Sequence, residues 1–530
     1  MGYFAVLVSC REISMLCKSP ELSGFDMEKK LSLLYSKLEK LESQLEDAVV
    51  KKKPIIDAVH RSQVRAAKNL IHYITFRSYD IRPLQMSLHK YGLSALTSSE
   101  SHILCQIRAV LKRLGKKYTS NDIGCNDRKS NKQSLMKESI KLFGAKKDDL
   151  PHIMVTFDKS FTDDIPYLEE LLSKGMDVAR INCAHDDEET WLQMIGNLKI
   201  ASEKTGFECK VYMDLAGPKI RSVFLGKKSK KSKIKLEEGS LFLLAEKNAD
   251  FSKKDIVIGC SYGGIVAQLK KGEPVLFDDG EIEAVIKENS NGIATLEVVR
   301  NSKKNFSLKA NKGINFPKST LNISSLTEYD KQCIPFICEN ADLLGYSFVR
   351  EPADLAELQS IIHTFAKQPK IIIKIETPES VNSLPALLLQ GMQQDVFGVM
   401  IARGDLAVEL GFERLSEMQD EILWFCEAGH VPVIWATQVL ETLHKTGIAT
   451  RSEMTDAAHA SMAECVMINK GEFTLEVIET LKDVLKRNLG HRNKKYYMMR
   501  PLQIARKTTK RRGNWGVVLP AAPSRKKNAQ

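Results

Sequence analysis

Eight short apolar runs, rich in β-branched residues, recur along the C-terminal two thirds of the chain. They begin near residues 153, 177, 209, 342, 369, 396, 431 and 465. Most starts lie about 24 to 35 residues apart, with helix-like segments between them, which is the spacing of βα units in a parallel sheet. Eight such units predict an α/β protein built on a (β/α)8 TIM barrel.

One interval, between the third run and the fourth, is far too long for a single βα unit. It contains strand-like runs such as SLFLLAEK, PVLFDDGEIEAVIKE and GIATLEVV, with turn residues between them. We therefore expect an inserted antiparallel β-domain over residues 222–309, and a barrel formed by residues 151–221 and 310–485. A doubly wound sheet is the alternative, but neither a GxGxxG after the first run nor a GxxxxGK[ST] P-loop supports it.

The chain before the barrel is predicted to be helical. An apolar seam with alternating spacings of three and four residues is formed by Leu31, Leu34, Leu38, Leu41 and Leu45. Such a seam is typical of a coiled coil or of one helix in a small bundle. We expect residues 1–26 to be a loose arm, and residues 27–147 to be a helical extension that ends in a polar linker from residue 116.

The basic charge of the chain is concentrated at its C-terminus. The whole chain has a formal charge of +12, and residues from Lys482 to Gln530 contain fifteen Lys or Arg and one acid, Asp483. The remainder is therefore close to neutral. We expect residues 486–530 to be a solvated basic tail, with contact to nucleic acid or an anionic membrane surface as the alternative.

Composition limits the class of protein. No apolar stretch reaches about 18 residues, so no transmembrane segment is expected. FAVLVSC near the N-terminus lacks the flanking features of a signal peptide, so we predict a cytoplasmic protein, with an organelle as the alternative. The eleven cysteines are scattered without a CxxC pair, which favours reduced thiols over a metal site.

Polar side chains stand where the strand runs end, which is where barrel enzymes carry their chemistry. Lys374 and Glu376 interrupt the run IIIKIE, and because alternate residues of a strand share a face, both are expected to point into the barrel mouth. The other runs end in Arg180 and Asn182, Asp214, Ser347, Asp405, and Thr437.

These side chains suit metal-assisted chemistry on a small acidic substrate. Glu376 and Asp405 can hold Mg2+, which takes one or two carboxylates and completes its octahedron with substrate oxygens and water. Arg180, Arg221 and Lys374 suit a phosphate or an enolate. A helix predicted to begin in GDLAVEL would offer free N–H groups to a carboxylate. The set predicts phosphoryl or enolate chemistry.

The same segments resemble those of the pyruvate kinase family. They are MDVARINCAH, MDLAGPKIR, FDDGEI, NKGINFP, SFVR, IIIKIET, VMIARGDLAVEL and VIWATQVLET, in the family's order. The resemblance covers roughly residues 151–485 and implies a barrel with a lid-like β-domain. It also implies the glycolytic reaction of phosphoenolpyruvate and ADP to pyruvate and ATP with Mg2+.

The resemblance implies roles for the matching residues around the reacting phosphate. Lys374 would steady the phosphoryl group in transfer and the enolate oxygen left behind, and Arg180 would bind the phosphate. Glu376 and Asp405 would hold Mg2+.

Further implied roles concern the phosphoenolpyruvate site. The backbone at Gly404 and Asp405 would hold the substrate carboxylate. Ser347 and Thr437 would line the site, with Thr437 beside the enol carbon and near the path of proton delivery.

The nucleotide is implied to lie under the lid. Arg221 and Lys312 would contact its phosphates. Asp279, or its neighbour Asp278, would help to close the lid over it.

Some positions depart from the family's pattern. Of the family's four ligands for a monovalent cation, Asn182 and Asp214 match, whereas Ala184 and Leu215 supply no side-chain oxygen. Lys219 stands where K+-dependent members have Glu, and an ammonium group can supply the charge of the missing ion. We therefore expect activity that does not depend on K+.

Two loops and the C-terminus also depart. VTFDKSFTDD replaces the family's Gly-Pro turn after the first strand, and MINKGEFTLEV replaces its Ser-Gly-Glu-Thr loop after the eighth; in the family both lie beside the nucleotide. The family's C-terminal effector domain has no counterpart here, so we expect no regulation by its sugar-phosphate ligands, and a homo-oligomer is left open. Two alternative functions are a catalytically impaired scaffold, and a Mg2+-dependent aldolase or lyase acting on pyruvate or oxaloacetate.

Overall fold

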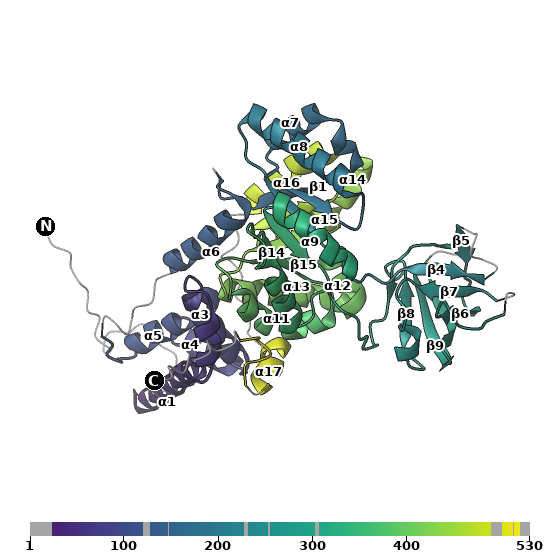
Figure 1. The fold of residues 1–530 in the computed structure, drawn as a ribbon. Coiled ribbons are helices and arrows are strands. Elements are labelled where there is room, and N and C mark those ends of the chain that lie inside the picture. Colours follow the sequence, from purple (N-terminus) through teal and green to yellow (C-terminus); the bar gives the residue numbers. More distant parts are fainter. Residues whose placement is uncertain are drawn as a thin grey trace, which may run out of the picture.

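In the computed structural model a helical extension precedes a barrel, and a β-domain is inserted into the sequence of the barrel (Figure 1). The structure describes residues 24–119, 128–146, 148–226, 232–252, 255–302, 307–488, 501–511 and 513–519. The expected loose arm lies almost entirely outside the described residues, since the first helix begins at Gly24.

The centre of the molecule is a closed barrel of eight parallel strands, in the order β1-β17-β16-β15-β14-β13-β3-β2. This confirms the predicted TIM barrel and excludes a doubly wound sheet, which would be open. The strands are β1 (His152–Thr156), β2 (Val178–Asn182), β3 (Lys210–Asp214), β13 (Leu343–Tyr346), β14 (Lys370–Ile375), β15 (Gly398–Ala402), β16 (Val433–Ala436) and β17 (Cys465–Ile468).

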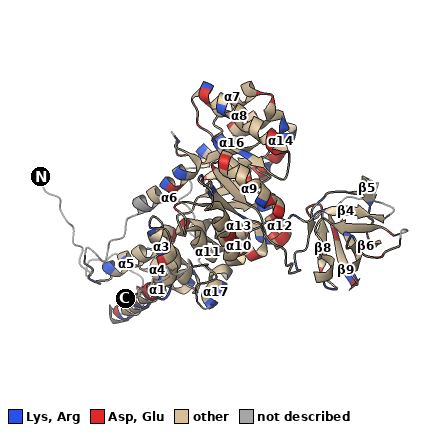
Figure 2. Ribbon diagram, viewed as in Figure 1, with Lys and Arg blue, Asp and Glu red and all other residues tan. Residues whose placement is uncertain are grey.

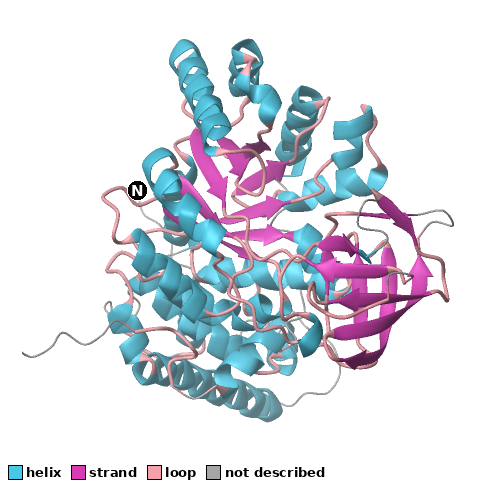
Figure 3. Cartoon of the chain, turned by 45° about the vertical axis from the view of Figure 1, so that its right-hand side comes forward, coloured by secondary structure: helices cyan, strands magenta, loops and turns pink. Residues whose placement is uncertain are grey.

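Helices surround these strands (Figure 3). Strand β14 reads KIIIKI, and all but its first residue are buried, as expected for a parallel strand covered on both faces. The helices are α7 (Ile165–Lys174), α8 (Glu188–Thr205), α9 (Glu328–Asn340), α10 (Pro352–Ile362), α11 (Pro378–Gly391), α12 (Arg403–Leu410), α13 (Phe412–Ala428), α14 (Glu441–Thr446), α15 (Arg451–Ala460) and α16 (Thr474–Asn488), with a 3-10 turn η3 (Lys159–Thr162).

The inserted β-domain leaves the barrel after β3, as predicted. Its main sheet has the order β12-β8-β9-β10-β6-β7-β4, and it has a separate apolar core that includes Phe242 and Phe277. The sheet is antiparallel except for the parallel pair β6 and β7, and it continues to Asn315 rather than ending at residue 309. Its elements are β4 (Ser222–Leu225), β6 (Leu241–Ala245), β7 (Val257–Cys260), η5 (Val266–Gln268), β8 (Pro274–Phe277), β9 (Ile282–Ser290), β10 (Ile293–Asn301) and β12 (Ile314–Asn315), beside a two-stranded sheet of β5 (Lys233–Lys235) and β11 (Ser307–Lys309).

The N-terminal extension is a bundle that packs on the barrel helices. Four of the five seam leucines are buried, and α1 packs on α3 and α5, so the seam belongs to a bundle within the chain. The elements are α1 (Gly24–Lys51), α2 (Lys53–Ala58), α3 (Val64–Arg77), α4 (Arg82–Lys90), η2 (Glu100–His102), α5 (Ile103–Arg113) and α6 (Arg128–Phe143).

Helix α6 lies inside the segment that was expected to be a linker. Its last residues, Leu142 and Phe143, are buried in one cluster with Met154, Val178 and Ile372 of the barrel strands. The C-terminal end of α6 therefore closes one end of the barrel. Its largely polar sequence hid this role, because only its C-terminal residues supply the apolar contact.

Part of the basic C-terminal segment is packed against the molecule, and the prediction of a solvated tail is wrong for residues 501–511 and 513–519. Leu502 and Ile504, which flank the start of α17 (Gln503–Lys510), are each 1% exposed, and the helix packs on α11 and α3. Trp515 is also buried, and the Lys52 ammonium lies 4.2 Å from the centre of its ring. The Lys and Arg residues of α17 (Figure 2) occupy its exposed side; residues 489–500 and 520–530 lie outside the described residues.

Two expectations from composition can be compared with the structure. In the described part of the chain, no helix is both long and apolar enough to cross a membrane. Seven described cysteines are free, as expected, whereas Cys105 forms a disulfide and departs from the expectation.

Candidate active site

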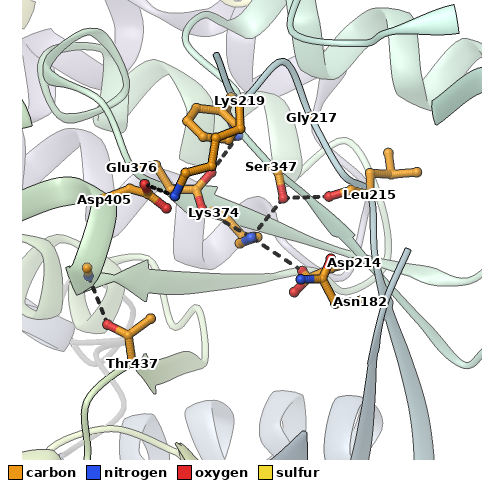
Figure 4. Close-up of polar contacts among 12 residues, drawn as sticks. Asn182, Asp214, Leu215, Gly217, Lys219, Ser347, Lys374, Glu376, Asp405 and Thr437 are labelled. Carbon is orange, nitrogen blue, oxygen red and sulfur yellow. Dashed lines mark hydrogen bonds and ion pairs between the residues drawn. The ribbon is translucent and has the colours of Figure 1, made fainter. Parts of the chain in front are cut away.

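Lys374 lies at the centre of a buried polar cluster at the C-terminal ends of the barrel strands (Figure 4). Its Nζ atom lies 2.7 Å from Ser347 Oγ, 3.1 Å from Glu376 Oε1 and 3.6 Å from Asp214 Oδ1. Burial opposes the charge of Lys374, but Asp214 and Glu376 raise the pKa of its ammonium above the ordinary value. The lysine is therefore held as a cation in a site largely closed to water.

Asp214 joins Lys374 to Arg180. The Arg180 Nε and Nη2 atoms lie 2.7 Å and 2.6 Å from Asp214 Oδ2, and Tyr212 donates to Asp214 Oδ1 at 2.5 Å. Burial alone would raise the pKa of the Asp214 carboxyl, but Lys374 and Arg180 hold it below its ordinary value. Gly345 of β13 leaves room for this group, since a Cβ atom there would lie 2.1 Å from Asp214 Oδ1.

Glu376 and Asp405 form the carboxylate side of the cluster. Glu376 Oε2 accepts a hydrogen bond of 2.6 Å from the N–H of Phe348. Burial raises the pKa of the Glu376 carboxyl, and the negative charge of Asp405 raises it further, while Lys374 opposes this. A buried carboxylate whose ionisation is opposed by a neighbouring carboxylate fits a divalent cation, whose charge would relieve the repulsion.

Lys219 lies on the same side of the cluster. Its Nζ atom is 2.6 Å from Asp405 Oδ1, and this carboxylate raises the pKa of the ammonium although burial opposes its charge. The preceding turn passes close to the loop after β13: Gly217 has a φ of +67°, and a Cβ atom there would lie 2.6 Å from the Phe348 ring. Figure 4 shows Lys219 beside Asp405 and Glu376.

The residues expected at a monovalent cation site do not fit such an ion. Asn182 Oδ1 already accepts the Ala184 N–H at 3.1 Å, and the Asp214 oxygens are taken up by Arg180 and Tyr212. Leu215 contributes only its backbone oxygen, which accepts the Ser347 hydroxyl at 2.7 Å. Two of the four expected side-chain ligands are thus missing, and the oxygens of the other two already accept hydrogen bonds from the protein.

Thr437 contacts the first turn of α12. The Gly404 N–H, which was expected to hold a substrate carboxylate, donates to Thr437 Oγ1 at 2.8 Å (Figure 4). Asp405 lies in the same turn, at the N-terminal end of the helix. A carboxylate that bound here through the Gly404 amide would replace the threonine hydroxyl as its acceptor.

The residues expected to contact the nucleotide lie at the junction of lid and barrel. Lys312 Nζ pairs with Asp278 Oδ1 at 2.8 Å, and an Arg221 Nη1 donates to the Asn311 carbonyl at 3.2 Å. Asp279 belongs to the same turn as Asp278. Asp279 also lies toward Lys219, because a Cβ atom on Gly313 would lie 3.3 Å from Lys219 Cε and 3.8 Å from Asp279 Oδ1.

A cavity of about 320 Å3 opens beside Arg180, between the loops that follow β1, β2 and β17. Phe157, Asp158, His185 and Lys470 are among its lining residues. Sequence reasoning named the loops after the first and eighth strands but did not single out these side chains. Their signal in the sequence is position alone, since each follows the end of a strand by one to three residues.

This arrangement can now be set beside known proteins. Residues 151–477 match the family model described as the barrel domain of pyruvate kinase. The chain belongs to the pyruvate kinase family. The match begins just before β1 and ends within α16, so the N-terminal extension and the C-terminal segment lie outside it.

Several pyruvate kinases are similar to this family member. The pyruvate kinase of Thermotoga maritima is 30% identical over 332 residues, which are 61% of this chain and 68% of that protein. The Bacillus licheniformis pyruvate kinase is 30% identical over 66% of this chain and 59% of that protein. The cytosolic isozyme of Solanum tuberosum is 32% identical over 58% of each chain. The match therefore spans under two thirds of the length of these two relatives. A crystal structure of a pyruvate kinase from Cryptosporidium parvum superposes with a TM-score of 0.57 at 25% identity, covering 66% of this chain and 70% of that one.

Proposed function

We propose that this member of the pyruvate kinase family transfers the phosphoryl group of phosphoenolpyruvate to ADP and protonates the enolate that remains. The cation cluster carries the proposal. Lys374 is a buried ammonium, and Arg180 lies on the other side of the same carboxylate, Asp214. Fixed positive charge in a site closed to water stabilises the negative charge that develops on a phosphoryl group and an enolate oxygen.

Each cation of the cluster has a defined task in this proposal. Arg180 has a planar guanidinium that suits two phosphate oxygens at once, whereas Lys374 supplies a compact charge at the bridging oxygen. Asp214 and Glu376 hold the lysine from two sides, so little reorganisation is needed when the substrate binds. The Thr437 hydroxyl would lie by the enol carbon, as the family resemblance implies.

Glu376 and Asp405 are proposed to hold Mg2+. Bound there, the metal would neutralise charge on substrate oxygens. The Lys219 ammonium already contacts Asp405 Oδ1, so the lysine must share this carboxylate with the metal or move from it. We also propose that no K+ is required, because Ala184 and Leu215 offer no side-chain oxygen at the expected cation site.

The test is the formation of pyruvate by the purified full-length chain. With phosphoenolpyruvate, ADP and Mg2+, we expect pyruvate in buffers both with and without K+. Lys374→Met should abolish it, because the variant removes the buried charge while keeping much of the side-chain volume. Lys287→Met, at an exposed lysine of the lid, is the matched control and should behave as the wild type.

Three results would contradict parts of the proposal. A folded wild-type protein that forms no pyruvate with any nucleoside diphosphate would refute kinase activity, and a folded Lys374→Met variant with wild-type activity would refute the role of the cluster. A steep rise of activity with K+ would refute independence of that ion.

A second candidate is a pyruvate-kinase-like binding protein without turnover. The Gly404 amide favours it, because this N–H is already paired with the Thr437 hydroxyl. Binding of phosphoenolpyruvate without product would support this candidate. An aldolase or lyase acting on oxaloacetate has less support, since such a reaction makes no use of a lid beside the barrel.

A further inference from the structure

The loop after β16 has a strained backbone. Thr437, Gln438 and Leu440 adopt φ values of +66°, +55° and +50°, in the left-handed region that side chains other than glycine rarely enter. Such a residue persists only where its surroundings hold it in place. Because Thr437 stands at the active site, the contacts that hold this loop also determine where its hydroxyl points.

One guanidinium supplies many of these contacts. The Arg403 Nε atom donates to the Ala436 carbonyl at 2.9 Å, and an Nη atom donates to the Thr437 carbonyl. The other Nη atom pairs with Asp456 of α15. The guanidinium also lies over the Trp435 ring, 4.7 Å from its centre, and Arg403 is 7% exposed.

Thr437 is therefore held at two points by consecutive residues of α12. Arg403 binds its carbonyl oxygen, and the Gly404 N–H binds its hydroxyl oxygen at 2.8 Å. A lysine at position 403 has neither the planar fork nor the reach to bind Ala436, Thr437 and Asp456 together. The contact to the Thr437 carbonyl therefore depends on arginine, and it remains when a substrate carboxylate displaces the hydroxyl from the Gly404 N–H.

We propose that Arg403 is a positioning residue, which holds the strained loop so that the Thr437 hydroxyl faces the carbon that is protonated. The inference rests on the proposed function. Arg403 touches the protein rather than the substrate, so its effect reaches the reaction through Thr437. Catalytic groups displaced by about 1 Å lose roughly 100-fold in rate, and loss of the guanidinium releases both backbone contacts.

The experiment separates protonation from substrate binding. Pyruvate incubated with the full-length protein and Mg2+ in D2O exchanges its methyl protons through the enolate, and NMR measures the rate without nucleotide. For Arg403→Lys we expect this rate and kcat to fall about 10- to 100-fold, with KM for phosphoenolpyruvate changed less than about threefold. Asp456→Asn, which weakens the ion pair but keeps the arginine, should show a smaller loss of the same kind.

Controls distinguish positioning from a general loss of structure. Arg414→Lys, at a half-exposed arginine of α13, should match the wild type. If Arg403→Ala folds, added ethylguanidine should restore part of its exchange rate. A folded Arg403→Lys variant that exchanges pyruvate protons at the wild-type rate overturns the inference, as does one that loses affinity for phosphoenolpyruvate while keeping kcat.

The two levels of the proposal fail in different ways. If the wild type neither forms pyruvate nor exchanges its protons, the proposed function and the inference fall together. If the wild type does both and Arg403→Lys equals it, only the inference falls.

Discussion

Replacing Glu409 with glutamine tests how the lid is joined to the barrel. Glu409 Oε1, near the end of α12, accepts a hydrogen bond of 2.7 Å from Asn315 Nδ2 on strand β12. The other polar atom of this amide, Asn315 Oδ1, is buried and has no hydrogen-bond partner in the described part of the chain. A protonated Glu409 could donate to that oxygen and complete a reciprocal pair.

The protonation of Glu409 is favoured by its surroundings. Burial raises the pKa of its carboxyl to about 7, with further increases from Asp405 on the same helix and Glu379 on α11, against the opposing effects of Asn315 and Arg350. Compared with the ordinary value of 4.5, this would correspond to about 3 kcal/mol, at about 1.4 kcal/mol per pH unit. Because the side chain keeps some contact with water, we expect about 1 to 2 kcal/mol.

The sign of the pH dependence of stability follows from proton binding. Native Glu409 binds its proton more tightly than the unfolded chain does, so its contribution is complete below about pH 4.5 and is lost as the pH rises through about 7. A glutamine at this position carries an N–H group at every pH and can pair with Asn315 permanently. Glu409→Gln should therefore remove about 1 to 2 kcal/mol of pH dependence between pH 5 and 8.

Urea unfolding at several pH values, followed by the fluorescence of a probe on the lid, measures this difference. Glu413→Gln is the matched control, because Glu413 is an exposed carboxyl at the start of α13, and its curve should run parallel to that of the wild type. If the Glu409→Gln curve also runs parallel to the wild type from pH 5 to 8, the reasoning is refuted. Asn315→Asp should instead destabilise the lid at pH 8, because the new carboxylate would lie beside the carboxylate of Glu409.

Two further predictions concern Lys219 and Trp515. Lys219→Met removes the ammonium from Asp405 Oδ1 and should tighten Mn2+ binding about tenfold. Electron paramagnetic resonance measures this binding, and unchanged affinity would show that the lysine does not compete with the metal. Trp515→Ala should destabilise the docked C-terminal segment by about 3 kcal/mol and expose it to limited proteolysis, whereas Val518→Ala, at an exposed position, should not.

The barrel could be predicted because its geometry repeats. Each βα unit needs a similar length of chain, so eight regular intervals and one long one indicated both the barrel and the insertion. Parallel strands also bring their C-terminal ends together, and the alternation of strand residues predicted that Lys374 and Glu376 share a face; the structure adds Asp214 beside Lys374. These parts of the fold follow from distances along the chain.

The remaining features depend on contacts that spacing cannot reveal. Lys219 pairs with Asp405, 186 residues away, and several acids lay at equally plausible strand ends. The Gly404 amide is taken by Thr437 because a strained loop turns that side chain toward it. The docking of the C-terminal segment was hidden by its mean charge, which conceals the few apolar residues, such as Leu502 and Trp515, that make the contact.

Helix α11 joins the docked C-terminal segment to the active site. Helix α11 begins directly after Glu376, where the Thr377 side chain accepts the Ser380 N–H, and its far end meets the C-terminal segment through a 2.8 Å bond from the Val518 N–H to Gln390 Oε1. Coupling between distant sites requires an element with two arrangements. Nearly every residue of α11 from Ser380 onward is buried, and a helix packed on all sides has little room for a second position. The contacts thus favour a role for α11 in fixing the position of Glu376 over a role in switching it. Loss of the C-terminal segment should therefore lower the stability of the protein before it alters the geometry of the site.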